Sequence, residues 1–183
     1  PTFIKAFRYD DEGRVIEETY ALTSGVTFGD TFSVSFEYDA QGRLHATTGP
    51  DQQTTSYGYD LLGRRTSVTD ASGQTQFEYD RWDNLVALID ANNQRTEFEY
   101  YADGKLWKER RPMGEETVYE YDAQGRLWNV TDPKLQTTEY GYDAQSRIDT
   151  ISYADGVTVT LSYDDDGNLS GYDDGITSTS YTY

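Results

Sequence analysis

The sequence predicts an all-β fold, a repeat array of antiparallel β-hairpins that form a curved meander sheet. Three observations support this prediction. One tyrosine–aspartate motif recurs at a nearly constant interval, each copy has the composition of a tight turn, and the segments between turns alternate apolar and polar residues. A regular period of this kind is typical of repeat architectures.

The motif is clearest at Tyr121–Leu127, which reads YDAQGRL and occurs letter for letter a second time at Tyr38–Leu44. Successive motif tyrosines are 20 or 21 residues apart, except for a first step of 29 residues. Related copies begin at Tyr9, Tyr59, Tyr79, Tyr100, Tyr142 and Tyr163, and Tyr183 stands where a further copy would start.

Each copy predicts a turn followed by a strand. Aspartate at the first turn position can bond to the backbone two residues on, and glycine at the fourth position adopts positive φ without a Cβ clash. The second residue after the turn is aliphatic except at Arg65, so we expect it to pack against the tyrosine across the hairpin. The residues that we assign this structural role are Tyr38, Asp39, Gly42, Tyr59, Asp60, Gly63, Tyr121, Asp122, Gly125, Tyr142 and Asp143.

Three copies depart from the pattern. Asp83 stands at a glycine position and tolerates positive φ better than most residues. Ser146 fits that position less well, which predicts strain or a different turn. In the copy that begins at Tyr100 the aspartate has moved to Asp103, but Gly104 keeps its place.

A second turn is expected about half a period after each motif, in clusters of Gly, Pro, Asn and Asp. Between the turns, segments such as Thr75–Tyr79 and Thr117–Tyr121 show the alternation typical of strands. Eight repeats then give roughly sixteen short strands. The expected second turns are at residues 70–73, 90–93, 111–114, 132–135, 154–156 and 173–175.

We predict a single domain over residues 1–183, because no linker interrupts the array. Residues 1–37 form an irregular first unit or an edge cap, and residues 38–183 carry the regular repeats. The eight added residues of the first step could lengthen two paired strands by four residues each, so that this arm covers the first sheet edge.

Composition limits the classes of partner. The net charge of −18 argues against nucleic-acid binding and against anionic membrane surfaces. No apolar run is long enough to span a bilayer, so we expect no membrane insertion. The absence of cysteine excludes disulfides and thiolate zinc sites.

No catalytic or metal-ligating set emerges, and we expect no enzyme activity, no metal and no cofactor. The turn hypothesis already explains the carboxylates Asp164–Asp166, Glu115 and Glu116, whereas glycoside hydrolysis needs two carboxylates at a defined separation. An EF-hand loop that began at Asp164 would place Gly175 where a glutamate is required, which leaves only weak, exposed calcium binding as an alternative. His45 is the only histidine and is interpreted as a strand residue.

Aromatic side chains are the best candidates for ligand contact. We expect the motif tyrosines to stack as an internal ladder along neighbouring strands. Trp107 and Trp128 follow core aliphatic residues directly and should face the other way. These two residues, together with Trp82, are the predicted ligand-binding residues, and a sugar ring is the ligand that they would suit.

The motif and its interval resemble the YD repeat of the Rhs-repeat family, which includes Rhs proteins, the B and C components of Tc toxins, and teneurins. The resemblance covers essentially the whole chain and is weakest over residues 14–37. It implies a partial YD-repeat spiral or shell. The segment Asp132–Leu135 is similar to the family's self-cleavage sequence, but it lacks the glycine and falls where a second turn is expected.

The resemblance implies a structural, encapsulating scaffold whose partner is an enclosed or fused effector domain or neighbouring repeats of the same chain. It also implies a secreted protein or one at the bacterial cell surface. The alternative is a cell-surface adhesion or carbohydrate-binding module, with a glycan as partner. Unpaired sheet edges additionally predict self-association.

Overall fold

The computed structural model describes residues 2–23 and 31–183 and contains only β-strands joined by turns. Residues 24–30, which belong to the predicted first arm, lie outside this range. The chain divides into two compact units, Pro1–Arg95 and Thr96–Tyr183. The division lies at the start of the strand Arg95–Tyr100.

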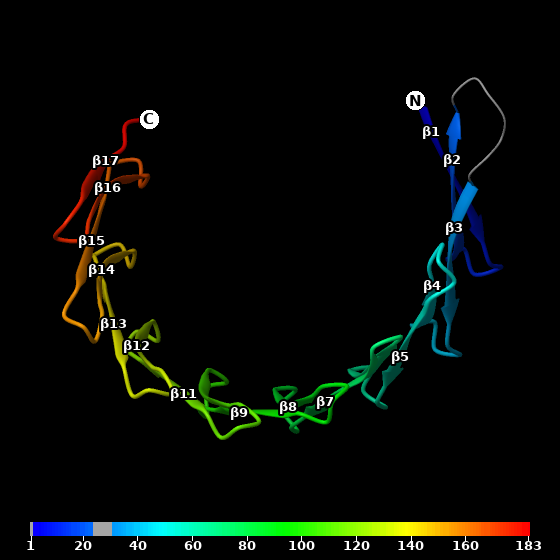
Figure 1. Cartoon of the computed structure of the whole chain (residues 1–183), viewed down its shortest axis with the longest axis horizontal. Helices are drawn as coiled ribbons and strands as arrows, with labels where there is room; N and C mark the ends of the chain where they lie inside the picture. Colours follow the sequence, from blue (N-terminus) through cyan, green and yellow to red (C-terminus); the bar gives the residue numbers. More distant parts are fainter. Residues whose placement is uncertain (1, 24–30) are drawn as a thin grey trace. The chain divides into compact units, whose positions relative to one another are not determined.

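The first unit is a meander in which each strand pairs antiparallel with the next one in the chain (Figure 1). Its strands are β1 (Thr2–Tyr9), β2 (Val15–Thr23), β3 (Thr31–Tyr38), β4 (Leu44–Thr48), β5 (Thr54–Tyr59), β6 (Arg65–Asp70), β7 (Gly73–Tyr79) and β8 (Leu85–Ile89).

The second unit repeats this arrangement from β9 to β17. Its strands are β9 (Arg95–Tyr100), β10 (Leu106–Arg110), β11 (Glu116–Tyr121), β12 (Leu127–Thr131), β13 (Thr137–Tyr142), β14 (Ile148–Ser152), β15 (Thr158–Tyr163), β16 (Leu169–Asp173) and β17 (Ser178–Ser180). The predicted all-β antiparallel meander is confirmed, with seventeen strands in the described residues in place of roughly sixteen.

The first three strands are longer than the rest. β2 has 9 residues and β3 has 8, whereas most later strands have 5 or 6. The long strands pair from Glu17 with Ser35 to Ala21 with Thr31, so the extra residues do lengthen a pair of strands. They continue the meander in chain order, and the proposed covering of an edge stays a prediction.

The motif turns form as predicted. In each, the amide of the fourth turn residue donates to the carbonyl oxygen of the first, as Gly125 does to Asp122 at 2.9 Å. Asp83 and Ser146 take the glycine position with φ values of 70° and 64° and keep the same bond. Ser146 therefore retains the common turn, and the alternative of a different turn is wrong.

The second turns also lie where the sequence places them. Asn93, Gly114 and Leu135 all have positive φ and donate their amides three residues back. The hairpin between β6 and β7 is tighter, because Asp70 pairs directly with Gly73. Asp132–Leu135 is one of these turns, as expected from its position.

A β-bulge follows every motif turn. Tyr121 pairs with Leu127, but the next pair is Glu120 with Asn129, so Trp128 is the extra residue. Trp107 and His45 hold the same place in their own hairpins. A bulge re-aims the side chain that it carries.

Strand pairing sorts the side chains onto two faces. An aromatic face carries pairs such as Tyr119 with Val130, and a polar face carries pairs such as Glu120 with Asn129. Only three apolar side chains in the described residues are buried, Ala46, Ala87 and Val159, and no large side chain is fully buried. Each unit therefore has no thick aliphatic core.

Candidate functional site

The repeated site of this chain is a clamp built from the motif aspartate and the arginine four residues later. At Asp122, Oδ1 accepts from the backbone amides of Gln124 and Arg126, both at 2.9 Å. Oδ2 accepts from the guanidinium Nε of Arg126 at 2.7 Å. The same three contacts occur at Asp10, Asp39, Asp60 and Asp143.

These contacts set the ionisation of the aspartate. Partial burial works to raise the pKa of Asp122, but the backbone amide and the guanidinium of Arg126 bond to the charged form and lower it below the usual value. The pKa values of Asp39, Asp60 and Asp143 are lowered by the same contacts against the same effect of burial. The turn is thus held by a carboxylate that stays charged.

The arginine of one repeat also contacts the tyrosine of the next repeat. The guanidinium carbon of Arg126 lies 4.3 Å from the ring centroid of Tyr142, and Arg43 lies 4.6 Å from that of Tyr59. Such cation–π contacts are favourable. Arg14, Arg64 and Arg147 make the equivalent contacts with Tyr38, Tyr79 and Tyr163.

Hydrogen bonds also link each repeat to the next. The hydroxyl of Tyr142 donates to the carbonyl oxygen of Leu127 at 2.6 Å, and Tyr59 donates likewise to Leu44 at 2.8 Å. Nη1 of Arg64 donates to the carbonyl oxygen of Asp80 at 2.8 Å. Each repeat is therefore fastened both within itself and to its neighbour.

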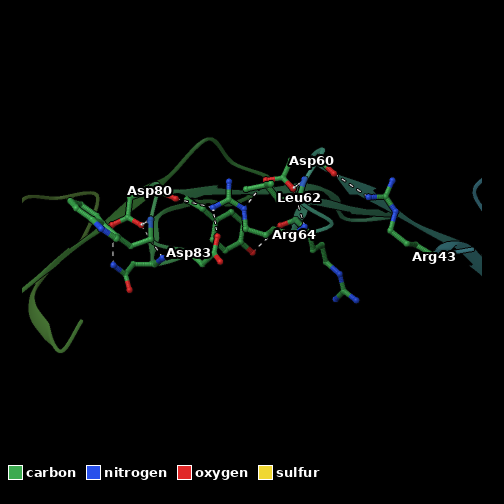
Figure 2. A network of polar contacts seen from close by, with 10 residues as sticks. Arg43, Asp60, Leu62, Arg64, Asp80 and Asp83 are labelled. Atoms are coloured by element: carbon green, nitrogen blue, oxygen red, sulfur yellow. Dashed lines mark hydrogen bonds and ion pairs between the residues drawn. The ribbon is translucent and has the colours of Figure 1, made fainter. Parts of the chain in front are cut away.

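Figure 2 shows this network across three successive motif turns. Arg43 reaches the carbonyl oxygen of Asp60 at 3.0 Å, while the side chain of Asp60 holds Arg64. Arg64 in turn reaches Asp80 and pairs with the carboxylate of Asp83 at 2.9 Å. Asp83 thus meets the arginine of the preceding repeat as well as completing its own turn.

Most motif tyrosines contact a cation and not the stacked tyrosine of the ladder that we expected. For Tyr38, Tyr59, Tyr79, Tyr142 and Tyr163 the neighbouring group is an arginine of the preceding repeat. Tyr121 takes Lys105 in the same way, at 5.6 Å, and contacts Tyr101 edge to face. The sequence analysis did not assign a role to the motif arginine. Its recurrence at the sixth position of the motif could have indicated one.

Two copies carry asparagine at the arginine position. Asn84 and Asn168 still hold Asp80 and Asp164 through Nδ2, each at 3.0 Å. The asparagine side chain is short, so it satisfies its own turn without a guanidinium to extend to the next repeat. The residue at this position therefore has two separable roles: it holds its own turn, and an arginine there also contacts the next repeat.

The copy that begins at Tyr100 differs most. Tyr101 occupies the position of the turn aspartate and makes the two backbone bonds of the turn with Lys105 and Gly104. Asp103 instead bonds to the backbone and side chain of Lys105. The ring of Tyr101 lies against Trp107 and Tyr121, at centroid distances of 6.2 and 6.0 Å.

A groove of about 460 Å³ opens beside this altered turn. It lies within the second unit and is lined by Tyr101, Ala102, Asp103, Lys105, Glu120, Tyr121, Asp122 and Trp128. The three predicted ligand-binding tryptophans are divided between the two units. Trp128 lines this groove, Trp107 contacts its wall through Tyr101, and Trp82 lies in the first unit, 67% exposed.

The other candidate residues occupy ordinary positions. His45 is an exposed bulge residue. Glu116 pairs with Arg110 across a hairpin, and Asp164 holds its own turn. Among the residues that the structure describes, no group of three or more His, Asp or Glu side chains could hold a metal ion, and no helix is long and apolar enough to cross a membrane.

These features define an antiparallel β-hairpin repeat protein. The RHS Repeat model matches residues 38–75 and 62–95, and the Teneurin YD-shell model matches residues 86–172. The chain belongs to the RHS-repeat and teneurin YD-shell family.

Its relatives are far longer proteins. It is 29% identical over 113 residues to the probable deoxyribonuclease RhsB of Dickeya dadantii, a match that covers 62% of this chain and 7% of that protein. It is 30% identical over 120 residues to human teneurin-4, which covers 58% of this chain and 4% of that protein. The chain therefore spans a small part of the relatives that it matches.

Solved structures show the same fold. A crystal structure of TcdB2–TccC3 without its hypervariable C-terminal region superposes with a TM-score of 0.76 at 17% identity, covering 94% of this chain and 11% of the other. A Photorhabdus luminescens Tc holotoxin pore structure gives a TM-score of 0.65 at 17% identity, covering 98% of this chain and 12% of the other.

Proposed function

We propose that this chain is a wall segment of an encapsulating shell, which encloses an effector domain carried by the same polypeptide or the same assembly. The observation that carries the proposal is the clamp, which passes from repeat to repeat through Arg43, Arg64, Arg126 and Arg147. It stabilises a sheet that lacks a thick core, which is the requirement for a thin wall.

The mechanism is steric. Within each unit, every internal strand has both neighbours hydrogen-bonded, so the backbone offers no gap and no free edge between repeats. The clamp holds adjacent hairpins together on the side of the motif turns. A polypeptide behind such a wall is kept from proteases and from premature contact with its target.

The comparisons support this proposal, because the superposed structures belong to a toxin assembly. By the same analogy we propose that the protein is secreted or displayed on a bacterial surface. The nuclease activity in the name of RhsB is a property of that relative, of which this chain covers 7%. We assign no catalytic role to the repeats.

The test is protease protection in the intact polypeptide that contains these repeats. Limited trypsin digestion should leave an enclosed domain uncut in the native protein. Paired variants Arg64→Ala and Tyr79→Phe should open the wall locally and expose it. A control variant, Arg81→Ala, removes an arginine that lies over the exposed Trp82 and should leave the protection intact. An enclosed domain that is cut at the same rate with and without the wall would contradict the proposal.

The alternative is an adhesion or carbohydrate-binding module, which takes its support from the exposed indoles of Trp82 and Trp128. Saturable glycan binding that is lost on replacing these tryptophans would favour it. Self-association through sheet edges also stays a prediction, to be measured by sedimentation of the 183-residue chain.

A further inference from the structure

The groove beside Tyr101 lies at the motif turn whose residues differ most from the repeated pattern. In the other motif turns the first residue is an aspartate that holds an arginine or an asparagine four residues later, as Asp122 holds Arg126 and Asp80 holds Asn84. Here the bulky ring of Tyr101 and the shorter side chain of Lys105 take their place. Positions that break a local pattern within an otherwise consistent array are candidates for function.

The chain places cations over its aromatic rings throughout the array. Arg81 lies 3.9 Å from the ring centroid of Trp82, and Lys108 Nζ lies 4.8 Å from that of Trp107. Trp128 is different: no lysine or arginine from the described part of the chain lies over its ring, which is 44% exposed.

Carboxylates surround this open ring. The indole N–H of Trp128 donates to Oε1 of Glu139 at 3.2 Å, which fixes the ring orientation. Glu120 lines the same groove and accepts from Nδ2 of Asn129 at 3.2 Å. Neither carboxylate pairs with a lysine or arginine within the described residues, so an aromatic face and two negative charges are left without a cation.

We propose that this groove binds the lysine or arginine side chain of an extended polypeptide partner, with the cation over the ring of Trp128 and within reach of Glu120 and Glu139. An ammonium or guanidinium over a tryptophan face is the favoured geometry for a cation–π contact. Carboxylates beside the ring strengthen the attraction, and the net charge of −18 draws cationic segments toward the chain.

A neutral sugar is the competing occupant, since it too can stack on an indole. The charges favour the cation. Of the charged side chains that line the groove, Asp103, Glu120 and Asp122 are acidic and Lys105 alone is basic. Lys105 is held by Asp103 and lies over Tyr121 and not over Trp128, which leaves the ring of Trp128 accessible.

The experiment follows the three indole N–H resonances of the 183-residue chain by NMR. The probe is an acetylated, amidated peptide of alternating glycine and lysine, and a glycine–glutamine peptide is the matched neutral probe. The lysine peptide should shift the Trp128 resonance saturably. Trp82 and Trp107, whose rings already carry cations, should move little.

Variants separate this site from general attraction to an acidic chain. Glu120→Gln should weaken binding up to about fivefold, as expected for the loss of a partly exposed ion pair. Glu37→Gln removes the same charge from the equivalent strand position of the first unit, next to Tyr38, and should leave binding unchanged. Rebuilding the common turn with Tyr101→Asp and Lys105→Arg should abolish the Trp128 shift by removing the altered wall.

Several results would overturn the proposal. Equal shifts with the glutamine peptide, equal effects of the two glutamate variants, or parallel movement of all three indoles would each exclude a specific cation site. A shift of Trp128 by chito-oligosaccharide but not by the lysine peptide would assign the groove to a sugar. The absence of any Trp128 shift with the lysine peptide would also refute the proposal.

Discussion

Arg64 lies over the ring of Tyr79, with 4.9 Å between its guanidinium carbon and the ring centroid, although the two residues belong to successive repeats. The same guanidinium holds Asp60 through Nε at 2.7 Å. One side chain therefore closes its own turn and fastens the next repeat. Because the array has no thick core, such polar and cation–π contacts carry a larger share of its cohesion than in a globular domain.

Removing one tyrosine hydroxyl tests the bond between repeats. Tyr142→Phe deletes the donor to the carbonyl oxygen of Leu127, a half-buried bond of 2.6 Å. We expect the free energy of unfolding to fall by about 1 kcal/mol, the usual net value of one hydrogen bond. Urea denaturation followed by tryptophan fluorescence measures this change.

The matched control is Tyr153→Phe. Tyr153 is 43% exposed, and its hydroxyl makes no hydrogen bond with the residues that the structure describes. Its removal should change the unfolding midpoint little. Equal losses in the two variants would show that the Tyr142 bond contributes nothing specific.

Replacing an arginine by lysine separates charge from geometry. Arg126→Lys keeps the positive charge but loses the planar fork that bonds Asp122 and reaches Oγ of Ser146 at 3.1 Å. The chain contains a natural precedent, because Lys105 stands 5.6 Å from the Tyr121 centroid where Arg126 stands 4.3 Å from that of Tyr142.

We expect faster hydrogen exchange at the amides of Gln124 and Arg126, since the aspartate that accepts them is less firmly held. Amides of the first unit serve as the internal reference. Arg111→Lys, which changes an exposed arginine paired with Glu109, should leave the exchange of both amides as it was. Slower or unchanged exchange in Arg126→Lys would count against the clamp.

Much of this fold follows from the sequence, because turn chemistry is local. Asp-x-x-Gly fixes where each hairpin turns, and even Asp83 in place of glycine was predictable from its tolerance of positive φ. The alternation of residues such as Thr117–Tyr121 then specifies strands of the right length.

The clamp and the groove were harder to predict because they depend on register between repeats. The bulge that makes Trp128 the extra residue is invisible to simple alternation. The reach of Arg64 to Asp80 depends on the separation of adjacent hairpins, which residue types alone do not give. The displaced aspartate Asp103 and the retained Gly104 were predicted correctly, but the residue types alone do not show that the ring of Tyr101 lies against Trp107 and Tyr121.

Glycine positions offer a reciprocal pair of substitutions. Ser146 adopts φ of 64°, so Ser146→Gly should stabilise the chain by about 0.5–1 kcal/mol by relieving backbone strain, less what is lost with the Arg126 bond. Gly63 has φ of 86° and open space where a Cβ would stand, so Gly63→Ser should destabilise by a similar amount through the backbone alone. Thermal or urea unfolding measures both, and effects of the same sign in the two variants would refute the strain argument.

Acid should destabilise this protein despite its excess of negative charge. Hydrogen bonds from the backbone amides of Thr177 and Ile176 lower the pKa of Asp174 to about 2, against the opposing effect of burial. A group whose pKa is lower in the folded state contributes stability above its unfolded pKa of about 4, and this contribution is lost as the pH falls through the folded pKa. The clamp aspartates, including Asp122 and Asp143, are shifted in the same direction.

Two effects therefore oppose each other on acidification. Protonation of the exposed carboxylates relieves the repulsion of a chain with net charge −18, which favours the folded state. As the pH falls from about 4, the unfolded pKa, toward the lower folded pKa values, the stabilisation by the turn carboxylates is lost. This loss should dominate because these carboxylates hold the hairpin turns. Urea midpoints between neutral pH and pH of about 2 should stay level or rise slightly at first and then fall.

Asp174→Asn isolates one turn in this titration, because the amide oxygen still accepts the two backbone bonds but no longer titrates. Hydrogen exchange at Ile176 and Thr177 should accelerate below pH of about 4 in the native chain, relative to the intrinsic rate, and should lose that dependence in the variant. Asp166→Asn, in a turn that is held by Asp164, is the control and should retain it. A native chain whose protection at these amides persists below pH of about 2 would show that backbone pairing, not the carboxylate, holds the turn.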